Sequence, residues 1–442
     1  MRSIDVLVVG GGSAGWAVAG MLAEAGRDVL VVDRRSDAMA GARWINGVPP
    51  WCFDEARLPR PEAPERWGGA HPPACVLSVA GTDARIRVGD PAPWHVDMRL
   101  LVARLRGRAR AAGARFARGV VREVRAGDRV RRVEIEGMGA LSPRLVVDAS
   151  GIRGVVRRAM RAGRWPIVAP EDTCVAAQHT FAVRDARALE RWLEARGARP
   201  GDSAGILGVA GGYSTLTLFT EPTLREVGVL TGSIPALGEP SGAALIRAFV
   251  AQSPWLGERR FGGQGAIPLR RPYRVLGAGG VALVGDAACQ VYASHGSGVG
   301  MGLVAARALC DALERAEDPG AAEALRGYSR AFHRRHGGLL AGADAFRRLS
   351  SSLRAEDIAQ LIESGVFDAR VFASGLAQRT PRVDVAGSRA PREVPPPGRA
   401  CSRGCSRRSA ASRRSPPSAA RRPRGGGAIC TSASWRGLVG AA

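Results

Sequence analysis

The sequence predicts an α/β fold in which a parallel β-sheet with flanking helices carries an inserted antiparallel sheet and is followed by C-terminal helices. Three observations support this class. An apolar strand, a glycine-rich turn, an apolar helix and a second apolar strand follow one another within residues 1–33. Short apolar runs at residues 145–147 and 281–284 have the length of further buried strands. Residues 165–272 instead alternate apolar and polar side chains, which is typical of antiparallel strands with one buried face.

The first strand ends in the turn GGGSAG, residues 10–15, which has the G-x-G-x-x-G register. In this register Gly10 permits the tight turn, Gly12 lets the backbone approach a pyrophosphate, and Gly15 lets the helix pack closely on the strand. The helix that follows offers free N–H groups and the positive end of its dipole to phosphates. The second strand ends in Asp33, whose carboxylate can accept hydrogen bonds from a ribose. The order of these elements predicts that the chain binds an adenine dinucleotide.

A later strand-like run continues into GDAA, residues 285–288, and a second glycine-rich turn, residues 296–302. These segments resemble the flavin-dependent oxidoreductases built like p-hydroxybenzoate hydroxylase, a superfamily that includes geranylgeranyl reductases, aromatic hydroxylases and flavin-dependent halogenases. The resemblance implies a Rossmann-like FAD-binding domain of the GR2 type, with Asp286 at the ribityl chain of FAD and Gly298 beside the flavin ring. The family usually has a proline where this chain has Ala293, so the loop over the flavin is expected to differ in shape. FAD rather than NAD is the expected dinucleotide.

Two intermediate segments resemble the same superfamily. VDMR, residues 96–99, resembles the segment in which an arginine reaches the FAD pyrophosphate, which makes Arg99 the candidate. DASG, residues 148–151, resembles the geranylgeranyl-reductase branch, although an ordinary strand-to-turn junction that only needs Gly151 is the alternative. Motif spacing and resemblance together assign these residues to the cofactor: Gly10, Gly12, Ser13, Ala14, Gly15, Asp33, Arg34, Arg99, Asp148, Gly285, Asp286, Gly296, Gly298 and Val299.

Two side chains are candidates for catalysis. His295 precedes the second glycine-rich turn, so it could donate a proton or a hydrogen bond to the flavin or the substrate; the alternative is a hydrogen bond to loop backbone. Cys52 resembles a cysteine near the flavin in geranylgeranyl reductases, and the alternative is packing in the core. Tyr213 could line the cavity or pack on a sheet. The eight cysteines show no metal-ligand spacing, so no metal is expected.

The length of 442 residues predicts two domains and an appendage. The expected parts are an FAD-binding domain (1–40, 95–164 and 273–316), substrate-binding insertions (41–94 and 165–272), C-terminal helices (317–378) and a tail (379–442). The alternation TLTLFT at residues 215–220 predicts a sheet that forms an apolar wall of the substrate cavity. The tail is rich in Arg, Pro and Ser and is expected to be disordered; a shifted reading frame of a GC-rich gene is the alternative.

The net charge of +24 does not by itself predict a nucleic-acid partner. All 64 basic residues are arginine, and 14 of them lie in the tail, against only Asp384 and Glu393. No run of arginines interleaved with aromatic residues is present, and such runs are typical of single-strand binding. No apolar run reaches the ~18 residues that span a bilayer, and the start lacks a signal-peptide layout, so a cytoplasmic location is expected. The expected partner is an apolar small molecule, with the oligomeric state left open.

Three functions fit the sequence. The first is an FAD-dependent reductase or monooxygenase acting on an apolar isoprenoid or aromatic molecule, with NAD(P)H as a transient external reductant because no second G-x-G-x-x-G is present. GAIP at residues 265–268 resembles a segment that lines the flavin in reductases of this class. The second is a flavin-dependent halogenase, suggested by Trp16 after the first turn but opposed by the absence of lysine and of a W-x-W-x-I-P motif. The third is a lycopene-cyclase-like enzyme that holds FAD without net redox turnover.

Overall fold

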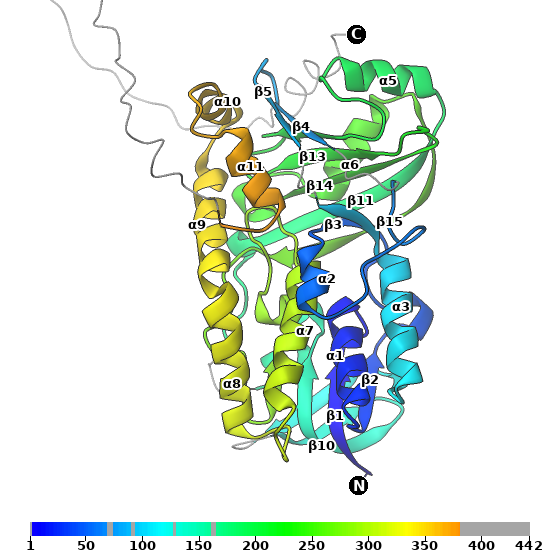
Figure 1. Cartoon of the computed structure of the whole chain (residues 1–442), viewed down its shortest axis with the longest axis vertical. Helices are drawn as coiled ribbons and strands as arrows, with labels where there is room; N and C mark the ends of the chain where they lie inside the picture. Colours follow the sequence, from blue (N-terminus) through cyan, green and yellow to red (C-terminus); the bar gives the residue numbers. More distant parts are fainter. Residues whose placement is uncertain (1, 69–73, 90–92, 127–129, 161–164, 381–442) are drawn as a thin grey trace, which may run out of the picture.

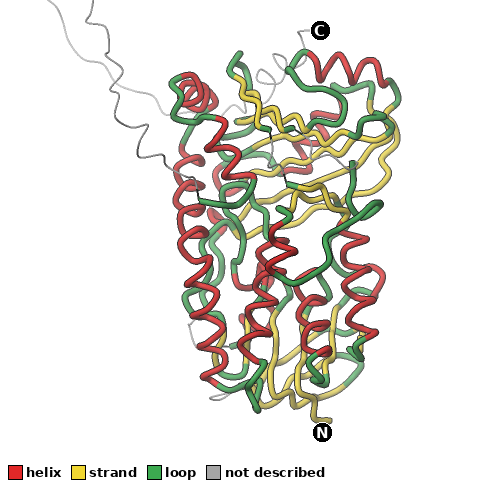
Figure 2. Tube along the Cα trace, viewed as in Figure 1, coloured by secondary structure: helices red, strands yellow, loops and turns green. Residues whose placement is uncertain are grey.

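The computed structural model describes residues 2–68, 74–89, 93–126, 130–160 and 165–380. Two sheets are stacked along the long axis of the molecule, one containing the N-terminal strand and the other lying at the opposite end (Figure 1). A long helical column runs along one edge beside both (Figure 2). The predicted α/β class, with a parallel sheet, a second sheet and C-terminal helices, is confirmed.

The first sheet has eight strands and a parallel centre. β1 (Arg2–Val9) pairs in parallel with β10 (Gly139–Asp148) on one side and with β2 (Val29–Asp33) on the other. Parallel pairs continue the sheet to β17 (Val281–Leu283) and β7 (Arg115–Arg118). The antiparallel strands at its margins are β8 (Val121–Ala126), β9 (Val130–Ile135) and β16 (Gly277–Ala278). The central strands are apolar runs buried on both faces, as parallel strands between layers require.

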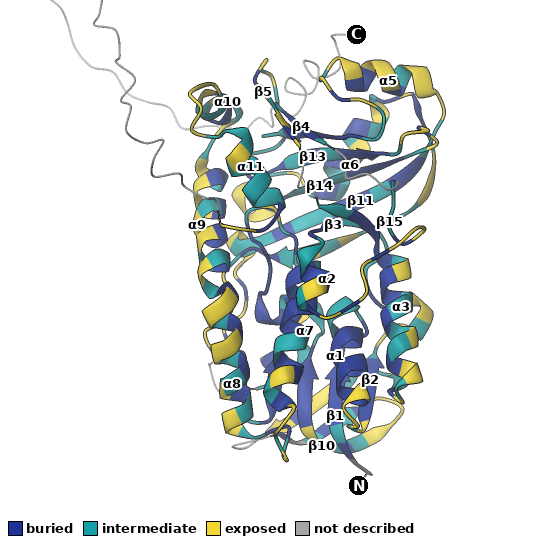
Figure 3. Ribbon diagram, viewed as in Figure 1, coloured by how far each residue is buried: buried dark blue, intermediate teal, exposed yellow. Residues whose placement is uncertain are grey.

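Helices cover the first sheet and begin at its strand ends. α1 (Ser13–Glu24) starts directly after the first glycine-rich turn and packs against both α3 (Met98–Ala111) and α7 (Val299–Leu313). α3 is amphipathic, and its buried side includes Leu101 and Leu105. Figure 3 shows α1 and α7 as the most deeply buried helices of this half. The dinucleotide turn and the second glycine-rich turn therefore meet at one edge of the sheet.

The second sheet has seven strands and is antiparallel except where β12 pairs in parallel with β4. Its strands, in spatial order, are β15 (Leu256–Pro268), β11 (Thr173–Val183), β14 (Glu226–Ser233), β13 (Thr215–Thr220), β12 (Ser203–Leu207), β4 (Cys75–Val79) and β5 (Arg85–Val88). α5 (Ala186–Glu194) and α6 (Gly242–Ala251) cover one face through a core of their own. The other face looks towards the first sheet (Figure 1).

The remaining elements connect the two halves. β3 (Ile45–Val48) pairs with β6 (Trp94–Asp97), and α2 (Trp51–Glu55) follows β3 and packs on α7. α4 (Val155–Ala159) follows β10. The helical column consists of α8 (Ala322–Phe332), a π-helical turn (His333–Gly337) and α9 (Gly338–Ser352), and two shorter helices follow it: α10 (Ala355–Glu363) and α11 (Ala369–Leu376).

The tail predicted at residues 379–442 lies almost wholly outside the described residues. Arg379 and Thr380 are described, and the Arg379 guanidinium lies 5.0 Å from the centre of the Trp51 ring. The body of the protein therefore continues at least to residue 380. No helix within the described ranges is long and apolar enough to cross a membrane.

Candidate active site

The first glycine-rich turn has the geometry that its three glycines predict. Gly10 has a left-handed φ of +111°, and a Cβ there would collide with the backbone of Ala149 at the end of β10. A Cβ on Gly15 would fall well inside 3.0 Å of the Gly10 carbonyl oxygen, so only glycine lets α1 approach the turn. A Cβ on Gly12 would meet no atom within 4 Å, because Gly12 faces a cavity. Each glycine thus serves a different contact, and of the three only Gly12 has open space at the position of a Cβ.

Asp33 lies at the end of β2 beside this turn. One carboxylate oxygen accepts a hydrogen bond from the Gly11 N–H at 2.9 Å, and the other accepts one from the Arg35 N–H at 2.8 Å. The side chain lines the cavity together with that of Arg34. Each oxygen keeps a lone pair for a further donor, so the carboxylate is fixed in position and can still accept a ribose hydroxyl.

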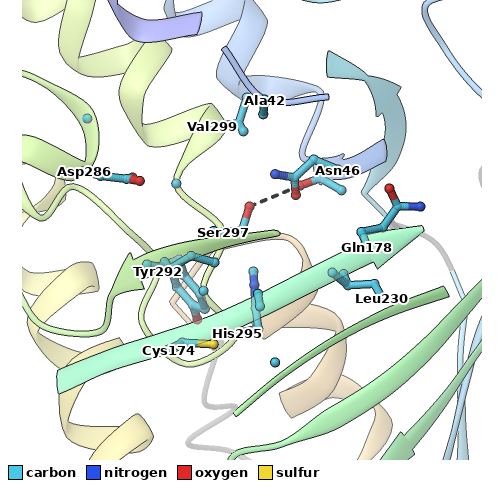
Figure 4. Close-up of a pocket in the computed structure, with 18 of the residues that line it drawn as sticks. Ala42, Asn46, Cys174, Gln178, Leu230, Asp286, Tyr292, His295, Ser297 and Val299 are labelled. Atoms are coloured by element: carbon cyan, nitrogen blue, oxygen red, sulfur yellow. Dashed lines mark hydrogen bonds between the residues drawn. The ribbon is translucent and has the colours of Figure 1, made fainter. Parts of the chain in front are cut away.

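Asp286 lies on the opposite side of the same cavity, in the short turn Gly285–Ala288. Its Oδ1 lies against Gly298, where a Cβ would be 2.9 Å away. No donor in the described part of the chain hydrogen-bonds this carboxylate, and burial raises its pKa to about 6. A buried carboxylate without a donor is costly, so this position is suited to a ligand hydroxyl. Figure 4 shows Asp286 and Val299 projecting towards the cavity.

The cavity has a volume of about 1030 Å³ and reaches from the first glycine-rich turn to the second sheet. This is at the upper end of the ~300–1,000 Å³ usual for ligand sites, which leaves room for a dinucleotide and a second molecule. The residues at the first sheet fit FAD: an open glycine at the pyrophosphate position, an acid at the ribose position and an unpartnered acid at the ribityl position. The predicted cofactor residues that line it are Gly10, Gly12, Ser13, Ala14, Asp33, Arg34, Gly285, Asp286, Gly296, Gly298 and Val299.

The strand register determines which side chains of the second sheet face this cavity. Thr215 and Thr217 of β13 line it, whereas Leu216 and Leu218 belong to the core beneath α6. Phe219 of the same strand also lines the cavity, so the cavity face of β13 carries one aromatic ring beside two threonines. The cavity face carries hydroxyls and small residues next to a few apolar side chains such as Leu230 (Figure 4).

A second, more apolar wall comes from the C-terminal helices. The part of the cavity that they line, here called the helical arm, is bordered by Leu339, Ala343, Phe346, Leu353, Ile358, Phe367, Val371, Phe372 and Leu376. Three of its phenylalanines form a chain of ring contacts, with centroids 5.5 Å apart between Phe346 and Phe367 and 6.1 Å apart between Phe367 and Phe372. A long apolar molecule would lose its hydration here.

Arg99 does not line the cavity, contrary to its predicted contact with the pyrophosphate. Its guanidinium pairs with Asp97 at 2.6 Å and lies 3.4 Å from the centre of the Phe261 ring on β15. Both contacts hold the side chain at the junction between α3 and the second sheet. Arg34, Arg35 and Arg153 do line the cavity, and the latter two were not predicted. Arg153 follows the glycine of DASG, which is the signal that could have identified it.

Asp148 is structural in this protein and does not line the cavity. It is fully buried at the end of β10, where one oxygen accepts from the Ser150 hydroxyl at 2.5 Å and the other from the Arg157 N–H at 2.8 Å. Burial raises its pKa, while these hydrogen bonds act in the opposite direction. Asp148 thus holds the strand-to-turn junction, while Ala149, Ser150 and Gly151 of DASG line the cavity.

Cys52 is also a core residue and lies outside the cavity lining. Its Sγ would be 2.5 Å from a Cβ on Gly300, so the thiol fills the space that this glycine leaves between α2 and α7. The side chain is inaccessible to solvent, and burial raises the pKa of the thiol far above its usual range. A thiol in this environment remains neutral and out of reach of a ligand.

His295 lines the cavity beside Tyr292 (Figure 4), and its catalytic role stays a prediction. Its Nε2 lies 3.2 Å from the carbonyl oxygen of Gly375 on α11, and desolvation by the surrounding protein lowers its pKa. The neutral ring can donate this hydrogen bond. The residue therefore contacts both the cavity and a C-terminal helix, and the second contact has no signal in the sequence.

Tyr213 and Cys174 bring two further ionisable groups to the centre of the cavity. Tyr213 reaches the second glycine-rich turn, and its hydroxyl would be 3.0 Å from a Cβ on Gly296. The Cys174 thiol hydrogen-bonds this hydroxyl, and burial raises the pKa of both groups, that of Cys174 to about 12. Cys174 was not predicted, because only the register of β11 turns it towards the cavity.

The chain is similar to several known proteins. A family model described as lycopene cyclase protein matches residues 5–187. Digeranylgeranylglycerophospholipid reductase 1 of Methanopyrus kandleri is 27% identical over 338 residues, which are 73% of this chain and 84% of that protein.

Two solved structures share the fold. A geranylgeranyl bacteriochlorophyll reductase-like protein from Thermoplasma acidophilum superposes with a TM-score of 0.69 at 18% identity, covering 85% of this chain and 95% of the other. The p-nitrophenol 4-monooxygenase of Pseudomonas putida superposes with a TM-score of 0.62 at 19% identity, covering 87% of this chain and all of the other (100%).

Proposed function

We propose that this chain is an FAD-dependent oxidoreductase like the geranylgeranyl reductases and the monooxygenases related to p-hydroxybenzoate hydroxylase, and that it hydrogenates a C=C bond of an apolar, isoprenoid-like molecule. The electrons would come from external NAD(P)H. The observation that carries this proposal is the helical arm, an apolar compartment continuous with the dinucleotide end of the cavity. The similarity to an archaeal lipid reductase over most of the chain supports it.

The helical arm favours a substrate that binds by burial rather than by charge. Arg379 is the one charged side chain that borders the arm among the described residues. Burying apolar surface contributes about 25 cal/mol per Å², so an elongated hydrocarbon could obtain its affinity from this arm alone. The threonines of β13 lie on the facing wall and suit the polar end of such a molecule.

The residues of the first sheet would hold FAD, with Gly12 at the pyrophosphate, Asp33 at a ribose and Asp286 at the ribityl chain. When bound and reduced, FAD supplies a hydride, and the second carbon of the double bond must then receive a proton. Tyr213 is placed to donate it, since its hydroxyl lies against the second glycine-rich turn and inside the cavity. The raised pKa of Tyr213 keeps the hydroxyl protonated, and Cys174 hydrogen-bonds it.

Tyr213→Phe should slow hydrogenation while leaving reduction of the cofactor unchanged. Loss of a positioned proton donor costs about 10²- to 10⁴-fold in the step that it serves. The measurement is stopped-flow absorbance of the two half-reactions, flavin reduction by NADPH and reoxidation by the acceptor. Tyr292→Phe is the matched control, because Tyr292 also lines the cavity. If reoxidation by the acceptor is slow in Tyr292→Phe and normal in Tyr213→Phe, Tyr292 is the proton donor.

The reaction itself is tested by anaerobic reduction of the FAD-loaded protein, followed by a panel of polyprenyl acceptors. Recovery of flavin absorbance together with a saturated product supports the proposal. Reoxidation only by O₂, with a hydroxylated aromatic product, would instead make the protein a monooxygenase like its neighbour from Pseudomonas putida.

A second candidate is a lycopene-cyclase-like reaction without net redox change, which the family match over residues 5–187 favours. It predicts that an isoprenoid is isomerised or cyclised with no consumption of NADPH. The same incubation distinguishes the two, because hydrogenation adds two mass units to the product and cyclisation adds none. A halogenase remains disfavoured, since the chain contains no lysine.

A further inference from the structure

Helix α11 forms a thin cover over the helical arm. Val371, Phe372 and Leu376 line the cavity, yet none of the residues of α11 is fully buried. Phe372, Ala373 and Leu376 also pack against a small apolar cluster on β4 and β5, and Arg370 is exposed to solvent. Figure 3 shows the contrast with α1 and α7, whose surfaces are mostly buried. A single, partly exposed helix separates this part of the cavity from water.

The C-terminal end of α11 is attached to the cofactor side of the cavity by two ring nitrogens. Trp51 of α2 donates its indole N–H to the carbonyl oxygen of Ala377 at 2.8 Å. His295, in the loop before the second glycine-rich turn, donates to the carbonyl oxygen of Gly375 at 3.2 Å. The Ala377 carbonyl has no backbone donor in the described structure, so Trp51 satisfies a group that would otherwise need water. The Gly375 carbonyl also accepts from the Gln378 N–H at 2.9 Å, so His295 is its second donor.

Gln378, which follows Ala377, opposes this attachment. Gln378 has a left-handed φ of +50°, a conformation that a residue with a side chain adopts at a cost. Its side chain is 1% exposed, and neither its amide nitrogen nor its amide oxygen has a partner in the described structure. Buried amide atoms without partners are costly. The left-handed conformation belongs to the C-terminal cap of α11, in which the Gln378 N–H donates to Gly375 at 2.9 Å and the Arg379 N–H donates to Ser374 at 3.0 Å, so it moves with the helix. The cost of the unpartnered amide disappears when the segment moves into water, and this cost opposes the closed position of α11.

We propose that α11 is a lid that opens to admit the apolar ligand and closes when Trp51 and His295 bind its C-terminal carbonyls. The N-terminal hinge is the turn at Gly365, which has a φ of +75°, and the C-terminal hinge is Gln378. Because His295 lies in the loop over the cofactor position, closure also fixes that loop. The lid concerns access to the cavity and does not depend on which reaction takes place there.

Two substitutions should shift the lid in opposite directions. Trp51→Phe removes one attachment and should raise the amide hydrogen-exchange rate of α11 about three- to tenfold, since one hydrogen bond is lost. Gln378→Gly relieves the left-handed strain and removes the unpartnered amide, so it should lower this rate about fivefold or more. Trp192→Phe, in the separate core beneath the second sheet, is the matched control and should not change exchange in α11.

Exchange is measured on the full-length, FAD-loaded protein, and uptake of the apolar fluorophore 1-N-phenylnaphthylamine is measured by stopped flow on the same samples. Uptake should be faster in Trp51→Phe and slower in Gln378→Gly. The lid is refuted if α11 exchanges as slowly as α9, if both variants shift in one direction, or if exchange changes while uptake does not. Gln378→Ala removes the amide but keeps the strain, so its rates should lie between those of the wild type and Gln378→Gly.

Discussion

Alanine at Gly12 should weaken FAD binding about 100-fold in a protein that still folds, whereas alanine at Gly15 should destabilise the first sheet itself. A methyl group on Gly12 meets no protein atom within 4 Å and occupies the space of the pyrophosphate. A methyl group on Gly15 collides with the Gly10 carbonyl, and the neighbouring strand end prevents Gly10 from moving away. Such overpacking costs about 3 kcal/mol or more. The expected loss of FAD affinity for Gly12→Ala is about 100-fold, which corresponds to about 3 kcal/mol of binding free energy.

Both effects are measured by thermal unfolding of the apoprotein and by titration with FAD followed by flavin fluorescence. Gly20→Ala is the matched control in the same helix, because a methyl group there would lie 3.5 Å from Ala109, an ordinary contact. It should melt at or above the wild-type temperature, since alanine favours helix. A Gly15→Ala protein that melts and binds FAD normally would disprove the assigned packing role.

The features predictable from the sequence are those specified by local order along the chain. The turn at residues 10–15 and the acids Asp33 and Asp286 each follow a strand directly. A strand end in a parallel sheet has a fixed place relative to its neighbours, so the position of such a residue follows from the sequence. These residues do line one cavity.

The features that could not be predicted depend on partners far along the chain. Arg99 is held by Phe261, Cys52 by Gly300, and His295 by Gly375, and no local pattern indicates these pairings. Each side chain had a plausible role from its neighbours in sequence, and a distant contact determined its actual position.

The alternating pattern of β13 shows a second limit of prediction from sequence. Period-2 alternation reveals that a strand has two kinds of face, but both faces of β13 are covered, one by α6 and the other by the cavity. Leu216 and Leu218 pack under the helix, whereas the aromatic ring of Phe219 lies on the cavity face. The face open to a ligand retains Thr215 and Thr217. Strand pattern alone therefore cannot assign the cavity wall.

Asp286→Asn should stabilise the apoprotein at pH 8 and at the same time weaken FAD binding. Burial raises the pKa of Asp286 from 3.8 to about 6, so the folded apoprotein binds this proton more tightly than the unfolded chain does. The carboxylate thus imposes no penalty below pH 3.8, a growing penalty up to about pH 6 and the full penalty above it. Water in the cavity partly screens the charge, which limits the gain in the variant to about 1–2 kcal/mol.

The carboxylate of Asp286 destabilises the apoprotein but is expected to strengthen FAD binding. A ribityl hydroxyl that donates to the carboxylate favours its charged form and lowers its pKa in the complex, so wild-type FAD affinity should rise with pH up to about 6 and then level off. Asp286→Asn should bind about tenfold more weakly above pH 7, where a charge-assisted hydrogen bond is lost, and its affinity should lack this pH dependence. Calorimetric titrations and melting curves at pH 5 and pH 8 measure both effects. A variant that is less stable than the wild type at pH 8, or that retains the pH dependence of binding, would show that FAD does not use this carboxylate.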